Sequence, residues 1–208
     1  MVVSNTVAHA LVEALTKYKD LQPRWISVLG KLLGGHGAIG LLRYQSDYRI
    51  DLLLRAMEDE RPTLAEPTDE PAITLALLAG AVQGALTRYW IFSAYEALRM
   101  AKNLAAGKAD PKLRALYERF RIIRIPLAKL QIANDAGLKT GIMLGTIGPG
   151  ADTPPEEYSA KAKVEYHPVV LLNRETGSIG WMVIDGTTGI QETIFRRELS
   201  DQLLALFD

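Results

Sequence analysis

The sequence contains no cysteine, and it has only three histidines among its 208 residues. The absence of cysteine excludes disulfide bonds, thiolate metal ligands and cysteine nucleophiles, and it is typical of a cytoplasmic protein. His9, His36 and His167 are too few for a histidine-rich metal site, and no Glu-x-x-His pair of the di-metal helical bundles occurs. We therefore predict no metal and no cofactor.

The chain also lacks a net charge and a long apolar run. Its 24 Lys and Arg balance its 24 Asp and Glu, so no overall field draws it to nucleic acid or to an anionic membrane. The longest apolar run, Ile73 to Leu86, falls short of the ~18–20 residues that cross a bilayer. No basic segment followed by an apolar run begins the sequence. We expect a buried helix at 73–86, no membrane partner and no signal peptide.

The common catalytic motifs are missing as well. The sequence has no G-x-S-x-G, no H-E-x-x-H and no complete phosphate-binding loop. Residues 35–40 match G-x-G-x-x-G, but a dinucleotide site needs a strand before the glycines, and the preceding residues have a helical pattern. We interpret residues 35–40 as a turn between helices.

The most prominent feature that is present is an uninterrupted helical pattern over residues 71–106. Thr68 or Asp69 is placed to cap it, and Gly107 suits the residue after its end. Ala76, Gly80 and Gly84 recur every four residues, which gives a stripe of small side chains on one face. Such a stripe permits close approach of another helix, within the chain or between two chains, and it motivates the prediction of a dimer.

Three further helices are predicted before this one, at about 5–20, 23–33 and 41–57. In the third, the spacing directs Leu53, Leu54 and neighbouring apolar residues inward and most of the charged residues outward; these charged residues are Arg43, Asp47, Arg49, Asp51 and Arg55. Residues 58–70 are acidic and contain two prolines, so we predict an exposed connection. It separates an N-terminal helical segment, 1–60, from a core, 71–208, and we expect both to form one compact domain.

The C-terminal half changes from helical to strand periodicity. A helix from Pro111 is expected to be interrupted at Pro126, and residues 137–155 are expected to form a loop. Alternating apolar residues separated by turn sequences predict strands at about 164–172, 179–184 and 190–195, followed by a helix at 198–207. The predicted fold is α+β: mainly a helical bundle of five or six helices, with a small C-terminal three-stranded antiparallel meander and a terminal helix.

The helix at 111–130 carries a local excess of positive charge. It holds one acid, Glu118, and six basic residues: Lys112, Arg114, Arg119, Arg121, Arg124 and Lys129. This face is a candidate surface for phosphate, nucleic acid or an acidic protein partner. The alternative interpretation is that these charges pair with acids elsewhere in the fold, including Glu96.

A second candidate set lies on the long helix. Trp90, Tyr95, Glu96 and Arg99 share one segment, and Glu96 is able to accept a bidentate hydrogen bond from Arg121 or Arg124. The first interpretation is a buried polar network between two helices. The second is catalysis by Glu96 with Arg99, Arg121 or Arg124, because a carboxylate enclosed with cations has a shifted pKa.

Four segments together resemble a family of uncharacterised bacterial proteins: residues 90–99 (WIFSAYEALR), 124–129 (RIPLAK), 180–181 (GW) and 196–201 (RRELSD). The resemblance covers about the C-terminal two-thirds of the chain and implies a bacterial, cytoplasmic protein without an assigned activity. The helical pattern also invites comparison with HEPN-type ribonucleases. These ribonucleases use an Arg and a His four to six residues apart, and this sequence has no such pair. The comparison is therefore consistent only with a degenerate, non-catalytic relative.

Two functions follow from these patterns. The leading hypothesis is a non-enzymatic binding or interaction protein, a homo-oligomer whose contact surface is the basic 111–130 helix. The alternative is a small HEPN-like enzyme that acts on nucleic acid or a nucleotide and uses Glu96 with the nearby arginines.

Overall fold

The computed structural model describes residues 3–34, 37–63, 68–104, 110–138, 141–145, 154–159 and 164–208, and for residues 3–4 and 37–45 it describes the backbone only. Six α-helices lie in the described residues: α1 (Val3–Lys17), α2 (Leu21–Leu32), α3 (Gly37–Glu60), α4 (Glu70–Asn103), α6 (Pro111–Lys129) and α7 (Arg196–Leu204). The strands are β1 (Ile142–Leu144), β2 (Glu156–Tyr158), β3 (Val169–Leu172), β4 (Ile179–Ile184) and β5 (Gln191–Phe195). The predicted α+β fold is confirmed.

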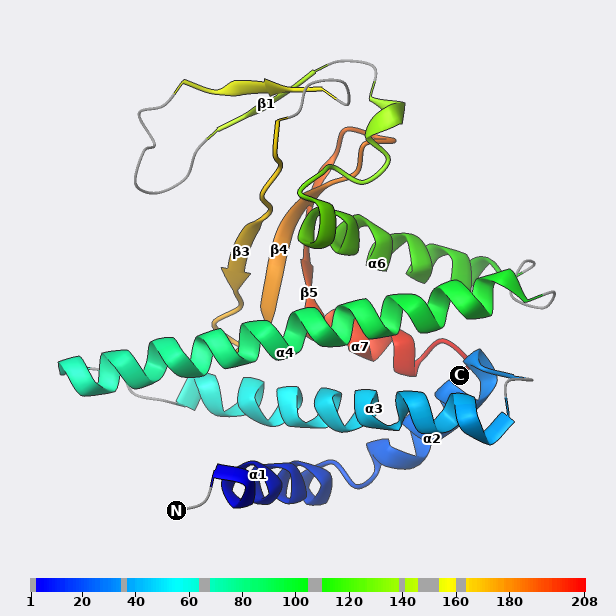
Figure 1. The fold of residues 1–208 in the computed structure, drawn as a ribbon, viewed down its shortest axis with the longest axis vertical. Coiled ribbons are helices and arrows are strands. Elements are labelled where there is room, and N and C mark those ends of the chain that lie inside the picture. The colour runs from blue at the N-terminus through cyan, green and yellow to red at the C-terminus, as the bar shows by residue number, and fades with distance from the viewer. Residues whose placement is uncertain are drawn as a thin grey trace.

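Helix α4 runs through the middle of the molecule, as predicted for residues 71–106. The carboxylate of Asp69 caps it by accepting a hydrogen bond of 2.8 Å from the backbone N–H of Ala72, and Pro71 occupies its first turn. Gly107, the expected terminating residue, lies outside the described residues. On one side of α4 lie α3 and then α1, and on the other lie α6 and the sheet (Figure 1).

The three C-terminal strands form the predicted antiparallel meander in the order β3-β4-β5. Helix α7 follows β5 directly and packs back on the sheet, which confirms the terminal helix. The prediction of a loop at 137–155 missed β1, which pairs with β2 to form a separate two-stranded sheet. Three residues per strand are too few for an alternating pattern to be recognised in the sequence.

The core lies where the helices meet the inner face of the meander. Trp90 of α4 contacts Trp25 edge to face, with ring centroids 6.4 Å apart, and it contacts Phe120 of α6 at 5.7 Å. Trp181 of β4 is also buried. These rings join α2, α4, α6 and the sheet into one hydrophobic cluster.

Helix α6 is not interrupted at Pro126. The helix is continuous from Pro111 to Lys129, and Pro126 lies in its last turn, where one backbone hydrogen bond is lost and the helix is about to end. Leu130 follows in the left-handed conformation and donates its N–H to the carbonyl of Pro126. The loss of a single bond so close to the end does not break the helix.

The predicted exposed connection at 58–70 was wrong in its first part. Helix α3 continues to Glu60, a short 3₁₀ turn covers Arg61–Thr63, and Glu58 is fully buried. The assignment of charged residues to the outer face of this helix was also wrong, because Asp47, Asp51 and Arg55 are buried. Their partners lie far away in the sequence, on α4 and α7, so the local pattern does not contain them.

The prediction that residues 73–86 form a buried helix was wrong as well. The first turns of α4 extend past the end of α3 (Figure 1), and most of their apolar side chains are exposed. By length and composition, α4 is the one helix among the described residues that is long and apolar enough to cross a membrane. The sequence prediction considered only the run 73–86, which by itself is shorter than a membrane span. Only 22% of its most apolar window is buried in the protein.

Candidate functional site

The residues proposed from the sequence as a polar site are not gathered around Glu96. Glu96 accepts a hydrogen bond of 2.7 Å from Nε of Arg99, one turn away on the same helix, and the two side chains are 38% and 50% exposed. Arg121 pairs with Glu118 of its own helix at 3.2 Å. Glu96 therefore forms a pair on the helix surface with Arg99, and the described contacts join neither Arg121 nor Arg124 to it.

Arg124 contributes instead to an aromatic contact between α4 and α6. Its guanidinium lies 5.2 Å from the ring centre of Tyr95, which stacks on Tyr117 with centroids 5.3 Å apart. The two hydroxyl oxygens are 3.1 Å apart, and the ammonium of Lys102 lies 3.8 Å from the ring of Tyr117. Burial, together with the hydrogen bond to Tyr95, raises the pKa of Tyr117 to about 12. The contact between α4 and α6 is thus a packing contact in which cations cover the tyrosine rings.

The basic face of α6 is divided between paired and exposed charges. Arg119 lies 4.0 Å from Glu192 and 3.8 Å from Glu198, and Arg121 pairs with Glu118. Three other basic residues of this face are exposed: Lys112, Arg114 and Lys129. In the described part of the chain, two of the six basic residues therefore pair with acids, and of these two Arg119 alone pairs with acids outside its own helix, as the alternative interpretation requires. No group of His, Asp and Glu among the described residues is arranged to hold a metal ion.

Replacing Glu96 with Gln is expected to leave the free energy of unfolding nearly unchanged, because exposed ion pairs contribute little to stability. Urea denaturation followed by tryptophan fluorescence measures the difference. Arg99→Gln is the matched variant and should give a similarly small change. A large shift of the urea midpoint in either variant would contradict the surface assignment of this pair.

The most strongly organised polar cluster was missed by the sequence analysis. Arg196, at the start of α7, is fully buried and donates from Nε and Nη2 to the two carboxylate oxygens of Glu58. Its Nη1 donates to Asp51, which also accepts from Nε1 of Trp25 at 2.9 Å and from Nε of Arg55 at 2.8 Å. Two acids of α3 and two arginines therefore neutralise one another in the core.

Hydrogen bonds extend this buried cluster to its edge. The hydroxyl of Ser200 donates to Asp51 at 2.6 Å, and Arg55 donates from Nη2 to Asp201 at 2.7 Å. The signal in the sequence is the spacing of Asp51, Arg55 and Glu58, which places all three on one face of a helix. That pattern alone does not distinguish a solvated face from a buried one. The buried partner of Glu58 is Arg196, which is 138 residues away in the sequence.

The cluster also makes stability depend on pH. Burial by itself raises the pKa of Asp51, but the charges of Arg196 and Arg55 and the hydroxyl of Ser200 outweigh it, so its pKa lies below the ordinary value. A carboxyl whose pKa is lowered by folding stabilises the native state above its unfolded pKa, near 4. This stabilisation is lost as the pH falls from about 4 through the lowered pKa. The buried cluster is therefore architectural and sensitive to acid.

The outer face of α4 carries a regular row of exposed apolar residues. Successive members are three and four residues apart, and we call them the α4 seam: Leu75, Leu78, Val82, Ala85 and Tyr89. Leu75 is 69% exposed, and Leu78, Val82 and Tyr89 are each exposed by more than half. At 3.6 residues per turn these positions share one side of the helix. An exposed apolar row of this length is unusual on a monomer, and exposed apolar patches of this kind are typical of association surfaces.

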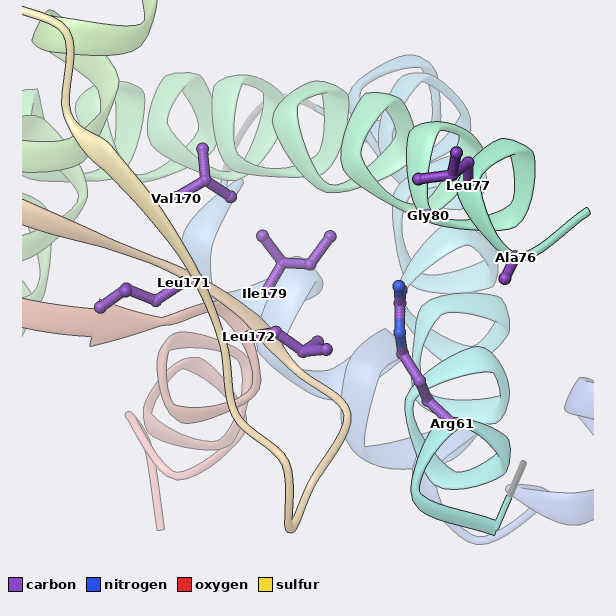
Figure 2. Close-up of a pocket in the computed structure, with 8 residues that line it drawn as sticks. All are labelled: Arg61, Ala76, Leu77, Gly80, Val170, Leu171, Leu172 and Ile179. Carbon is purple, nitrogen blue, oxygen red and sulfur yellow. The ribbon is translucent and has the colours of Figure 1, made fainter. Parts of the chain in front are cut away.

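The small-residue stripe lies on the opposite side of α4 and faces its own chain. A Cβ on Gly80 would lie 3.1 Å from Nη2 of Arg61, and one on Gly84 would lie 4.0 Å from Ile179. Beside the stripe is a cavity of about 310 Å³ between α4 and β3, which Arg61 enters from the end of α3 (Figure 2). Its remaining lining residues are apolar or glycine: Ala76, Leu77, Gly80, Val170, Leu171, Leu172 and Ile179.

Comparisons of the chain with protein-family models, curated proteins and solved structures found no match. The resemblance to a bacterial family and the cytoplasmic location therefore stay predictions. What the structure itself defines is an α+β protein with an exposed apolar helix face and an apolar groove beside a sheet edge.

Proposed function

We propose that this protein is a non-enzymatic interaction protein that self-associates through the α4 seam. The observation that carries the proposal is the 3-4 spacing of exposed apolar residues from Leu75 to Tyr89. This spacing is the one at which side chains of two facing helices interlock. Each leucine that passes from about two-thirds exposed to buried contributes roughly 1–2 kcal/mol, and a two-fold interface counts it twice.

The charges at the ends of the seam favour an antiparallel arrangement of two copies. Residues 71–87 carry no charge, Asp69 and Glu70 precede them, and Arg88 follows. An antiparallel pairing brings the two acids of one copy toward the arginine of the other, whereas a parallel pairing brings like charges together. Such rim charges select orientation more than they add affinity.

The α4 seam replaces the basic 111–130 helix as the main contact surface, because Arg119 and Arg121 have partners within the fold. Lys112, Arg114 and Lys129 remain exposed cations that suit an acidic partner in addition. The enzymatic alternative has less support, since Glu96 and Arg99 form an exposed pair without further described contacts to Arg121 or Arg124.

Leu78→Glu is expected to convert a dimer into a monomer, because each dimer would bury two carboxylates in an apolar seam and lose about 100-fold or more in affinity. Size-exclusion chromatography with light scattering measures the mass. Leu77→Glu is the matched control: Leu77 is equally apolar and 69% exposed, but it lines the groove on the other side of the helix. It should leave the dimer intact.

Thermal unfolding provides a second measurement. The midpoint of the wild-type protein should rise with protein concentration, as it does for a dimer, and that of Leu78→Glu should not. A monomer at every accessible concentration would overturn the proposal. So would a monomer that floats with phosphatidylcholine vesicles and loses this binding in both variants, because α4 would then be a membrane-binding helix.

A further inference from the structure

The open edge of β3 is a second unpartnered surface, independent of the α4 seam. β3 pairs with β4 on one side, and no described strand pairs with its other side. The N–H of Asn173 donates to the carbonyl of Ser178, which continues the β3–β4 ladder. The N–H of Asp185 donates to the carbonyl of Ile190, which continues the β4–β5 ladder. Because bonded pairs alternate in an antiparallel ladder, Val170 and Leu172 direct their N–H and C=O groups to the open edge.

The side chains of the same two residues face an apolar groove. Val170 and Leu172 pair with Trp181 and Ile179, so they lie on the face of the sheet that is buried at β4. At β3 that face is uncovered: Val170 is 56% exposed and Leu172 is 45% exposed. Leu77 forms part of the opposite wall (Figure 2). A strand added to β3 would therefore insert alternate side chains into this groove.

The guanidinium of Arg61 lies at the end of the groove next to Leu172. Nη1 of Arg61 donates to the amide oxygen of Gln83, whose nitrogen donates to the carbonyl of Gly177 at 2.9 Å. These contacts hold the guanidinium toward the groove, and within the described part of the chain they give it a neutral partner and no carboxylate. A guanidinium has five N–H donors in a fork that fits a carboxylate.

The groove is closed beyond Arg61. The turn after β3 packs directly on the end of α3, where a Cβ on Gly177 would lie 2.1 Å from the carbonyl oxygen of Glu58 and 2.9 Å from Cβ of Arg61. This contact limits the groove beyond Arg61 and favours a bound chain that ends there.

We propose that this groove binds the extended, apolar C-terminal tail of a partner protein, which adds to β3 as a parallel strand and places its terminal carboxylate on Arg61. The main-chain hydrogen bonds of β3 give the affinity, alternate apolar side chains fill the groove, and Arg61 selects a free chain end. The site uses the side of α4 opposite the seam, so binding does not require self-association.

The probe is a library of random seven-residue peptides displayed with free C-termini and selected on the full-length protein. Enriched sequences should carry apolar residues at alternate positions up to the last one. An enriched peptide is then synthesised with a carboxylate and with an amide at its C-terminus, and the dissociation constants are compared by fluorescence anisotropy. The amide should bind roughly tenfold or more weakly. Arg61→Gln should lose the same factor and no longer distinguish the two peptides.

Two substitutions test the strand addition. Val170→Pro removes the N–H that points to the open edge, and it leaves the hydrogen bonds between β3 and β4 intact. The variant should therefore fold but lose peptide binding. Thr193→Pro is the matched control: Thr193 lies between the bonded pairs of β5 and directs its N–H to the opposite edge of the sheet, so binding should persist. Should Val170→Pro not fold, N-methylation of alternate peptide amides removes the same bonds from the ligand.

Several results would overturn the proposal. These are a selection without enrichment, equal binding of the amide and the carboxylate, or unchanged binding by Val170→Pro and by the N-methylated peptide. A wild-type dimer that Val170→Pro alone converts to a monomer would assign the edge to a second copy. Leu78→Glu keeps the two proposals separate, because it should abolish the dimer and leave peptide binding unchanged.

Discussion

Arg196→Met is expected to lower the free energy of unfolding by about 3–5 kcal/mol, because it leaves buried carboxylates without their main counter-charge. Arg196 holds both carboxylate oxygens of Glu58 and one of Asp51, and all three side chains are fully buried. Its guanidinium also lies 5.5 Å from the ring of Trp90. Since small domains are stable by about 5–15 kcal/mol, this one change removes a large part of the total.

The measurement is urea denaturation followed by tryptophan fluorescence, since Trp25 and Trp90 both contact the cluster. Arg197→Met is the matched control. Arg197 is the next residue of α7, its side chain is 24% exposed, and it reaches Glu58 at 3.2 Å and Asp59 at 3.3 Å. Its loss should cost about 1 kcal/mol or less.

A double variant separates the loss of charge balance from the loss of packing. In Glu58→Gln with Arg196→Met, one buried negative charge disappears together with the positive one, so part of the lost stability should return. Similar costs for Arg196→Met and Arg197→Met would contradict the buried network. An additive double variant would show that the Glu58 and Arg196 side chains are not coupled.

The contrast between what the sequence predicted well and what it missed has a physical basis. Periodicity is local, and it located α4 and the three strands of the meander because each of these elements has an apolar face of its own, although the first strand begins at Val169 and not at 164. Burial is not local. The local pattern predicts that Asp51 and Arg55 lie on a solvated helix face. They are buried because the fold brings Arg196, more than 140 residues later in the sequence, next to them.

On α4 the error has the opposite sign, because apolar residues that were predicted to be buried are exposed. Residues 73–86 have the composition of a core helix, but the remaining elements cover one side of it only, so Leu75, Leu78 and Val82 stay exposed. The groove was also beyond the sequence, because it joins Leu77 of α4 to β3 and to Arg61 from the end of α3. Composition predicted a buried helix, and the fold leaves one side of it uncovered among the described residues.

Gly177→Ala is expected to cost roughly 2–4 kcal/mol of unfolding free energy, from two separate causes. Gly177 has a φ of +65°, in the left-handed region where an L side chain costs about 1 kcal/mol. The new methyl group would in addition lie 2.1 Å from the carbonyl oxygen of Glu58, so the turn must move away from α3.

Gly189→Ala isolates the first of these causes. Gly189 lies in the next turn of the same sheet with a φ of +71°, and a Cβ there has no neighbour within 4 Å. It should cost only about 1 kcal/mol. Equal losses for the two variants in urea denaturation would contradict the close packing of the turn on α3.

The Gly177 variant should also affect the groove. Movement of the turn breaks the 2.9 Å hydrogen bond from Gln83 to the carbonyl of Gly177, which fixes the amide that Arg61 contacts. Peptide binding should therefore weaken in Gly177→Ala and persist in Gly189→Ala, measured with the same carboxylate peptide under conditions where both variants are folded. Unchanged binding by folded Gly177→Ala would mean that Arg61 holds its position without the turn, and the closed end of the groove would lose its structural basis.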